Sequence, residues 1–358
     1  MKFLFIVQGE GRGHMTQAIS LADMLRSEGH EIVSVLVGKS KQREVPQFFY
    51  QKIKSEVTLF ESPNFVVDKK SKKINLAKTI FFNTLKIRTF TKSMFLINRK
   101  VKETNPDVII NFYDLMGGLF SFFCRPKAEY VCIGHQYLLL HPEFQFPKGF
   151  KIDRLLLRLN TRVVSLRSKK YLALSFKPMK NIPEKHIYVV PPLLRPEVTR
   201  LIPEKHGYIL GYMLNSEYAE DIEAWHRQNT DTNLHFFWDK KDAPEELQVA
   251  PNLVYHKIND VNFLEMMNNC DAYCSTAGFE SICEAMYLGK PIMMVPSYGH
   301  FEQACNALDG SLAGAGIASE TFNLTSLKEY MPHHIDISAE FCKWADSSKE
   351  KFLALLTK

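Results

Sequence analysis

Apolar runs of strand length alternate with segments whose apolar positions recur at helical spacing along most of this chain. Lys2 to Val7 is an apolar run that predicts a strand. The positions that face inward from the following helix are Met15, Ala18, Ile19, Ala22 and Leu25. Gly29 marks the end of that helix, and Glu31 to Val37 predicts the next strand. A strand, a helix and a strand in this order indicate the start of a doubly wound parallel sheet.

The same alternation continues in two series, with a proline-rich stretch between them. In the first series, further strands are expected at 107–112, 130–134 and 187–190. In the second, they are expected at 208–212, 234–238, 253–256, 271–275 and 292–295. Pro191, Pro192 and Pro196 lie in a stretch of the kind that links domains. The 358 residues also exceed the roughly 250 to 300 that one core supports, so we expect two α/β domains.

A turn of small residues between a strand and a helix begins the segment that carries most candidate chemistry, residues 275–306. Thr276, Ala277 and Gly278 place no bulky side chain where a ligand must approach the backbone. The helix start that follows leaves N–H groups unpaired, and these groups and the helix dipole attract phosphate. Glu284 lies less than two helical turns further on, where a carboxylate suits the two hydroxyls of a ribose. The turn and this carboxylate together predict a nucleotide site.

An acid and an amide, Glu302 and Gln303, begin the next helix, and such a pair suits hydrogen bonds to sugar hydroxyls. Asn306 follows one helical turn later. The ordered set resembles the donor-site signature of GT-B glycosyltransferases, in particular the family 28 N-acetylglucosaminyltransferases of peptidoglycan synthesis and the family 1 UDP-glycosyltransferases. This resemblance implies an α/β chain of the GT-B fold, with two Rossmann-like doubly wound domains facing a central cleft.

The resemblance also implies donor-binding roles for particular residues. The backbone turn that holds the diphosphate corresponds to Ala277, Gly278, Phe279 and Glu280. Glu284 corresponds to the ribose ligand, Glu302 and Gln303 to the sugar ligands, and Ile258 to a backbone contact with the base. Family 1 enzymes usually have a His-rich opening and Asp-Gln where this chain has 275–277 and 302–303, so the donor sugar stays open.

Domain roles follow from the same resemblance. Residues 1–190 correspond to an acceptor-side Rossmann-like domain, 191–202 to a linker, and 203–335 to a nucleotide-sugar-binding Rossmann-like domain. Residues 336–358 form a C-terminal helix expected over Ser338 to Leu356, which by analogy packs back on the N-terminal domain.

Glycines at positions 9, 11 and 13 precede His14 at the start of the first helix. Their spacing does not match a dinucleotide-binding fingerprint, because the third glycine of that motif would stand at position 14. The loop resembles the glycine loop of family 28 and the Gly-His opening of family 1, in which the His is the catalytic base. The positive end of a helix also disfavours an imidazolium, so we expect His14 to stay neutral and able to accept a proton. The alternative is that His14 caps the helix or binds an acceptor phosphate.

A base histidine generally needs a partner on its other nitrogen, and Asp114 is placed for this role at the end of an expected strand. Asp114 resembles the partner Asp of family 1, but it could instead cap a turn or a helix. His135 and Gln136 follow the next strand and resemble an acceptor-side loop of family 28, as do Gly11 and Gly13 of the glycine loop. His141, before a proline, is expected in loop structure.

Composition and charge indicate where the protein resides and which kinds of partner it can bind. Seven cysteines are scattered through the expected elements, which indicates reduced thiols, and no apolar run is long enough to cross a membrane. We therefore expect a cytoplasmic protein, with residence on the inner face of the cytoplasmic membrane as a further option. The net charge is +6, and residues 69–102 contain eleven Lys or Arg and no Asp or Glu. This segment and 151–170 are basic and amphipathic; they are either solvated helix faces or a surface for anionic lipid. No nucleic-acid module accompanies the charge, so no nucleic acid is expected.

The chemistry expected from these features is glycosyl transfer. The chain contains no Asp-x-Asp motif for a divalent metal, so the helix start after Gly278 would stabilise the leaving diphosphate without a metal or other cofactor. We expect an inverting transfer of a hexose or N-acetylhexosamine from a UDP-sugar to a hydroxyl acceptor, either a saccharide or a membrane lipid or lipid-linked saccharide of the cell envelope. Two alternatives are a UDP-sugar 2-epimerase of the same fold and a non-catalytic nucleotide-sugar binding protein.

Overall fold

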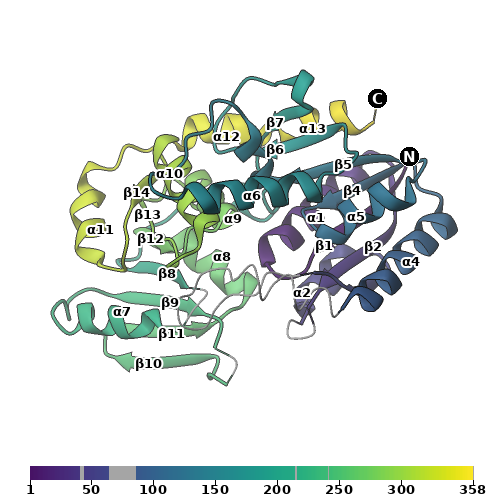
Figure 1. The fold of residues 1–358 in the computed structure, drawn as a ribbon. Helices are drawn as coiled ribbons and strands as arrows, with labels where there is room; N and C mark the ends of the chain where they lie inside the picture. The colour runs from purple at the N-terminus through teal and green to yellow at the C-terminus, as the bar shows by residue number, and fades with distance from the viewer. Residues whose placement is uncertain (41–43, 64–85, 214–215, 241, 358) are drawn as a thin grey trace. The chain divides into compact units, whose positions relative to one another are not determined.

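Two seven-stranded sheets organise the chain in this computed structural model, which describes residues 1–40, 44–63, 86–213, 216–240 and 242–357 (Figure 1). Unit 1 comprises 1–144, 148–195 and 346–358, and unit 2 comprises 145–147 and 196–345. The chain passes from unit 1 to unit 2 after Arg195, within the proline-rich stretch. The mixed α/β architecture with two parallel-sheet units confirms the predicted fold class.

The sheet of unit 1 is parallel throughout, and its strand order is β3-β2-β1-β4-β5-β6-β7. Its strands are β1 (Lys2–Gln8), β2 (Glu31–Lys39), β3 (Val57–Glu61), β4 (Val108–Phe112), β5 (Glu129–Gly134), β6 (Lys170–Leu174) and β7 (Ile187–Val190). The central strands β1 and β4 are buried on both faces because helices cover both sides of the sheet. In register, Ile6 of β1 lies between Leu36 of β2 and Asn111 of β4.

The helices of unit 1 are α1 (Arg12–Ser27), α2 (Gln47–Ile53), α4 (Ile87–Thr104), α5 (Leu115–Cys124), α6 (Lys151–Val164) and α13 (Ser348–Leu356), with 3₁₀ turns η1 (His135–Leu140) and η2 (Pro183–Lys185). All five positions predicted to face inward from α1 are buried. α13 packs against β7, and Lys170 on β6 donates to the carbonyl of Leu355 at 2.7 Å. Lys349 of α13 also forms an ion pair with Glu28.

The sheet of unit 2 has the order β10-β11-β9-β8-β12-β13-β14, in which β10 is antiparallel to β11. Its strands are β8 (Ile209–Met213), β9 (Leu234–Trp238), β10 (Glu246–Ala250), β11 (Leu253–Lys257), β12 (Ala272–Ser275), β13 (Ile292–Met294) and β14 (Gly316–Ala318). Its helices are α7 (Tyr218–His226), α8 (Asp260–Asn269), α9 (Phe279–Tyr287), α10 (Phe301–Leu312), α11 (Leu324–Tyr330) and α12 (Ser338–Asp346), with 3₁₀ turns η3 (Val198–Arg200) and η4 (Met331–His333). Phe236, Trp238 and Tyr255 form the aromatic centre of its core.

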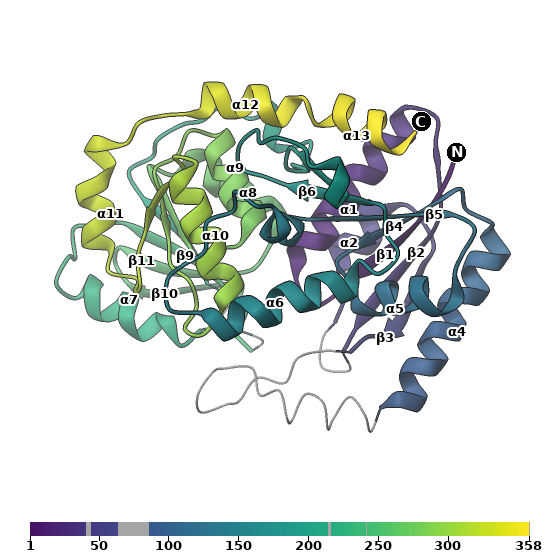
Figure 2. The same cartoon turned by 45° about the horizontal axis from the view of Figure 1, so that its top comes forward.

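One expected element is divided. The predicted single helix from Ser338 to Leu356 is two helices, α12 and α13, with Ser347 between them (Figure 2). Asp346, Ser347 and Ser348 carry short polar side chains that compete with the helical backbone for hydrogen bonds, which favours a break there. The break also falls where the chain passes from unit 2 to unit 1.

Candidate functional site

The turn after β12 lies at the point where the strand order of unit 2 reverses direction. From β8 the sheet extends to β9 on one side and to β12 on the other. Loops at the carboxyl ends of strands at such a reversal form the ligand sites of open α/β sheets. The predicted donor turn, Thr276 to Gly278, occupies this position.

Ala277 holds a left-handed backbone conformation in this turn, with φ at +51°. Such a conformation costs a non-glycine residue about 1 to 3 kcal/mol and persists only where the surroundings enforce it. Asn306 enforces it here, because its Nδ2 donates to the carbonyl of Ala277 at 3.0 Å. The side chain of Asn306 is buried, so α10 and the turn are joined in the interior.

The start of α9 is open toward the carboxyl edge of the sheet. Gly278 is the N-cap residue in an extended conformation, and no side chain among the described residues caps the helix. A Cβ at Gly278 would meet no described atom closer than the Ser281 hydroxyl at 3.9 Å, so there is space above the turn. The first N–H groups of α9 and its dipole therefore make this space favourable for an anion.

The remaining predicted donor residues lie on the elements around this turn. Glu284 is buried in the second turn of α9, and Glu280 is half-buried in the first. Burial raises the pKa of the Cys283 thiol on the same helix, and the charges of Glu280, Glu284 and Asp309 raise it further. The segment between α9 and α10 is held by Gln303, whose Oε1 accepts from the backbone N–H of Ser297 at 2.7 Å.

Two other predicted residues are partly accessible. Glu302 is half-buried in the first turn of α10. Ile258 is half-buried between the end of β11 and Asn259, whose side chain caps α8. The structure therefore assembles Ala277, Gly278, Phe279, Glu280 and Glu284 on one turn and helix, and it places Glu302 and Gln303 on α10, which is tied to that turn through Asn306.

Unit 1 repeats this arrangement at its own reversal, between β1 and β4. Gly11 is the N-cap residue of α1, Gly13 lies in its first turn, and His14 is its third residue. The ring of His14 is buried and stacks on Tyr113 at a centroid distance of 5.9 Å. Because β1 and β4 are neighbouring parallel strands, their carboxyl ends bring the loop after β1 and the turn after β4 together.

Both ring nitrogens of His14 have amide partners. Nδ1 lies 3.2 Å from Oε1 of Gln17, one helical turn further along α1, and Nε2 lies 3.4 Å from Nε2 of Gln136. An amide oxygen can only accept a hydrogen bond, and an amide nitrogen can only donate one. With the two amides oriented in this way, Nδ1 must donate to Gln17 and Nε2 must accept from Gln136. The pattern therefore assigns the proton to Nδ1 and the lone pair to Nε2 of a neutral His14.

The turn after β4 carries a second left-handed residue, Tyr113, with φ at +61°. Its hydroxyl bonds to the hydroxyl of Thr161 at 2.8 Å and accepts from Asn160 at 3.2 Å. Asn111 fixes Asp114, the residue after Tyr113. Its Nδ2 donates to the carbonyl of Asp114 and its Oδ1 accepts from the Asp114 N–H, both at 2.9 Å. The strained turn thus holds the Tyr113 ring against His14.

Asp114 is fully buried and caps α5, where its Oδ1 accepts from the N–H of Gly117 at 3.2 Å. This is the helix-capping role that the sequence left open. Burial raises the pKa of its carboxyl to about 7, and the charge of Glu10 adds to the rise, while hydrogen bonds from Ser62 and Gly117 oppose it. Nδ1 of His14, the nitrogen that an orienting carboxylate would take, is bonded to Gln17. A role of Asp114 toward His14 stays a prediction.

The other acceptor-side candidates have distinct surroundings. His135 is buried, and its Nδ1 donates to the carbonyl of Leu174 at 2.8 Å. Burial lowers the pKa of its ring to about 4, so it stays neutral near pH 7. Gln136, the next residue, lies beside His14. His141 bonds to the carbonyl of Lys180 and accepts from the N–H of Glu143, so it organises a loop, as expected.

Sequence reasoning missed Gln17 and Tyr113. A signal for Gln17 was present, because residues three apart on a helix face the same side, so it is one turn from His14. Nothing local in the sequence indicated that Tyr113 would stack on His14.

Within the described ranges, no group of three or more His, Cys, Asp or Glu side chains is arranged to hold a metal ion. Likewise, no helix in those ranges is long and apolar enough to cross a membrane.

Comparisons with known proteins bear on the fold and the family. Several solved GT-B glycosyltransferases share the fold over nearly the whole chain. Spinosyn rhamnosyltransferase SpnG, complexed with thymidine diphosphate, has a TM-score of 0.61 at 13% identity, with 100% of each chain covered. Arabidopsis thaliana UGT89C1, complexed with quercetin, has a TM-score of 0.63 at 14% identity, covering 99% of this chain and 98% of the other. SnogD from Streptomyces nogalater has a TM-score of 0.57 at 16% identity, covering 99% of each.

The fold and the family model together define a glycosyltransferase of the GT-B class. The model of glycosyl transferase family 1 matches residues 1–333, and the chain belongs to this family. A search of curated proteins found no match. The protein is thus an enzyme that transfers a glycosyl group, as the sequence predicted.

Proposed function

We propose that this glycosyltransferase moves a hexose or N-acetylhexosamine from a UDP-sugar to a hydroxyl acceptor, with inversion at the anomeric carbon and without a metal ion. The observation that carries the proposal is the open start of α9, where Gly278 leaves space above the first N–H groups of the helix, behind a left-handed Ala277. SpnG, which shares the fold, is complexed with thymidine diphosphate, and this is consistent with a nucleoside diphosphate as part of the donor.

Each donor residue then has one role. The N–H groups at the start of α9 bind the diphosphate, and the carboxylate of Glu284 accepts hydrogen bonds from the ribose hydroxyls. Glu302 and Gln303 bond to hydroxyls of the sugar, and the backbone at Ile258 contacts the base. As the bond between C1 and the phosphate oxygen breaks, negative charge grows on the leaving diphosphate. The oriented N–H dipoles stabilise that charge without having to reorganise.

His14 is the proposed general base. With the proton on Nδ1 donated to Gln17, Nε2 holds the lone pair, which faces Gln136 at 3.4 Å in this structure. The acceptor hydroxyl displaces this long contact and transfers its proton to Nε2. The acceptor oxygen attacks C1 from the face opposite the leaving UDP, so one C–O bond forms, one breaks, and the configuration inverts. The helix start at Gly11 keeps His14 neutral, because the positive end of α1 disfavours an imidazolium.

Gln17 is a positioning residue in this scheme. Gln17→Leu removes the acceptor from Nδ1 and allows the proton to move to Nε2, which blocks the base. We expect kcat to fall with little change in KM for the donor, while Gln17→Glu restores the acceptor and recovers most of kcat. Equal losses in both variants would contradict a tautomer-fixing role.

The acceptor is proposed to be a membrane lipid or a lipid-linked saccharide. UGT89C1, which shares the fold, is complexed with quercetin, and this is consistent with apolar acceptors bearing hydroxyls. The basic amphipathic segments predicted at 69–102 and 151–170 support a lipid acceptor; residues 69–85 lie outside the described residues.

Thermal-shift screening of UDP-sugars, followed by incubation of the best one with a lipid extract, tests the proposal. Stabilisation by one UDP-sugar and transfer of its sugar to an extractable lipid are the expected results. Conversion of UDP-N-acetylglucosamine without an acceptor would indicate an epimerase instead. Binding without hydrolysis or transfer to any acceptor would indicate a non-catalytic protein.

A further inference from the structure

Three helices of unit 1 lie side by side on one face of its sheet and expose large apolar side chains. α4 packs against α5, and α5 packs against α6 (Figure 2). The basic apolar face, as we call it, is centred on Phe95 of α4, Phe122 and Phe123 of α5, and Ile152, Leu155 and Leu159 of α6. All six are exposed, although residues of these types are usually buried.

α6 shows most clearly that apolar side chains face outward. Ile152, Leu155 and Leu159 are 71%, 66% and 53% exposed, and their spacing places them on one stripe of the helix. A helix that covers a sheet ordinarily turns such a stripe toward the core. In α6 the fully buried residues are Thr161 and Val164, near its C-terminal end. The apolar stripe therefore points outward.

The neighbouring helices extend this surface with aromatic rings. Phe95 of α4 is 69% exposed, and Phe123 near the end of α5 is 63% exposed. The rings of Phe122 and Phe123 contact each other edge to face at 5.1 Å. Exposed apolar side chains grouped on adjoining helices mark an interaction site more often than apolar residues scattered singly over a surface do.

Positive charge surrounds the apolar residues. The exposed stripe of α4 contains Arg88, Lys92, Arg99 and Lys102 together with Phe95. On α6, Arg154, Arg158 and Arg162 are spaced four residues apart, so their side chains share one side of the helix. Acidic residues are few here, with Glu103 at the end of α4 and Asp153 at the start of α6.

We propose that the basic apolar face binds the surface of an anionic lipid bilayer. Apolar side chains that project from a helix surface with Lys and Arg around them are the pattern of helices lying in a membrane interface. The apolar side chains would enter the boundary between headgroups and acyl chains, and the cations would pair with anionic headgroups.

The charge distribution argues against other occupants. A second copy of this chain would bring two positive surfaces together, which like-charge repulsion disfavours. Single-stranded nucleic acid is bound mainly by aromatic platforms in a groove, whereas the α6 stripe is aliphatic and projects outward. An anionic bilayer satisfies both the charge and the aliphatic side chains.

This surface deepens the proposed function, since it would hold the enzyme where a lipid acceptor resides. Membrane binding is nevertheless measurable without activity. Binding of UDP without binding of vesicles would contradict only the inference that the basic apolar face binds membranes. Binding of vesicles without binding of UDP or any other nucleotide would contradict only the proposed donor.

Flotation with vesicles tests the face directly. The full chain should float with vesicles of phosphatidylcholine mixed with phosphatidylglycerol, and much less with phosphatidylcholine alone. Arg162→Glu should lower the apparent partition coefficient about fivefold or more, and Leu155→Gln about tenfold. The matched controls lie in unit 2: Arg227 is also exposed, and Val261 is 66% exposed, the same fraction as Leu155.

Arg227→Glu and Val261→Gln should float as the wild type does, and all four variants should keep its thermal midpoint and UDP affinity. Equal recovery of the wild type with both vesicle types would overturn the proposal. So would equal losses in face and control variants. A concentration-dependent dimer in sedimentation that Leu155→Gln abolishes would assign the face to a second copy instead.

Discussion

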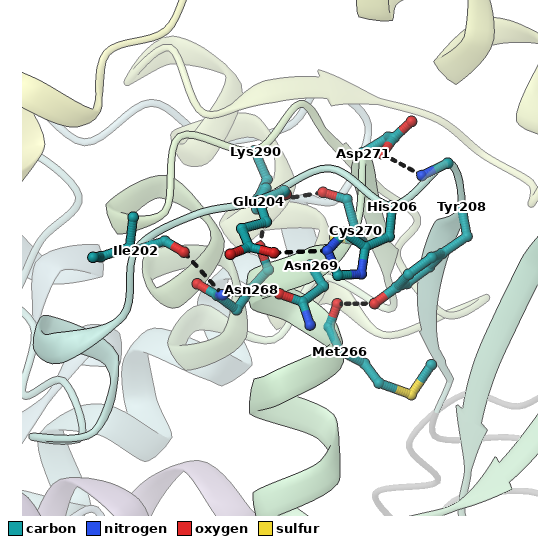
Figure 3. A network of polar contacts seen from close by, with 11 residues as sticks. Ile202, Glu204, His206, Tyr208, Met266, Asn268, Asn269, Cys270, Asp271 and Lys290 are labelled. Carbon is teal, nitrogen blue, oxygen red and sulfur yellow. Dashed lines mark hydrogen bonds and ion pairs between the residues drawn. The ribbon is translucent and has the colours of Figure 1, made fainter.

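Removal of Lys290 should destabilise unit 2 without changing a predicted site residue. Its ammonium group is buried and donates to three backbone carbonyls: Glu204 at 2.7 Å, Asn268 at 2.6 Å and Cys270 at 2.8 Å (Figure 3). These bonds tie the chain that leads into β8 to the end of α8 and the start of β12. Nearby, Asn268 donates to the carbonyl of Ile202, and Asp271 accepts from Gly207.

The magnitude follows from two opposing contributions. Hydrogen bonds that involve a charged group contribute about 1.5 to 3 kcal/mol each, so three would contribute about 5 to 9 kcal/mol. Burying the ammonium costs several kcal/mol, and burial indeed lowers the pKa of Lys290. Lys290→Met keeps the length of the side chain and removes the charge, but it leaves carbonyls without their donor. We expect a net loss of about 2 to 4 kcal/mol.

Thermal unfolding followed by circular dichroism measures this loss. A unit of this size loses about 2 to 4 °C of midpoint per kcal/mol, so Lys290→Met should lower the transition of unit 2 by about 10 °C. Lys343→Met is the matched control, because Lys343 is an exposed lysine on α12 of the same unit. If both variants shift the midpoint equally, the three carbonyl bonds do not stabilise the fold and the reasoning is wrong.

Four further predictions concern the candidate site. His14→Ala should lower turnover about 10²- to 10⁴-fold, as expected for loss of a general base, while calorimetry shows unchanged UDP affinity; unchanged turnover would remove the assignment. Glu284→Ala should weaken UDP binding, and an unaltered dissociation constant would contradict its ribose role. Gly278→Ala should keep the wild-type thermal midpoint, because the φ of −76° at Gly278 and the open space around it accept a Cβ. It should weaken UDP binding roughly tenfold, because the diphosphate is proposed to approach this turn. Equal UDP affinity would show that the diphosphate does not approach the turn. The folded-state pKa of Asp114 is raised to about 7, so its contribution to stability is complete below pH 4 and is lost as the pH rises to 7. In denaturant titrations, the free energy of unfolding of Asp114→Asn should gain up to about 4 kcal/mol relative to the wild type over that range. A difference that stays constant with pH would refute the raised pKa.

Much of the fold was predictable because its signals are local. Apolar runs of strand length located β1, β2, β9 and β12 to within about two residues, a usual error at element ends. The five inward residues of α1 followed from helical periodicity alone. The turn at Gly278 was predictable for the same reason, since small residues between a strand and a helix lie next to each other in the sequence.

The environment of each candidate residue was not predictable in this way. The carbonyl of Ala277 meets Asn306 from another helix, and His14 meets Gln136 across 122 positions of the sequence. Asp114 could be assigned either to capping or to His14, and only the folded turn showed its carboxyl at the N–H of Gly117. Contacts between residues distant in the chain depend on how the strands are ordered, which no local pattern records.

The sequence by itself determined the class of the protein: two α/β series, the donor turn before α9 and the glycine loop before His14, all of which are contiguous in the chain. Tertiary structure alone decided that Tyr113 stacks on His14, that Gln136 lies beside it, and that the apolar stripe of α6 points outward. The physical reason is general: periodicity states which residues share a face of a helix, but only the packing of neighbouring elements determines which way that face points.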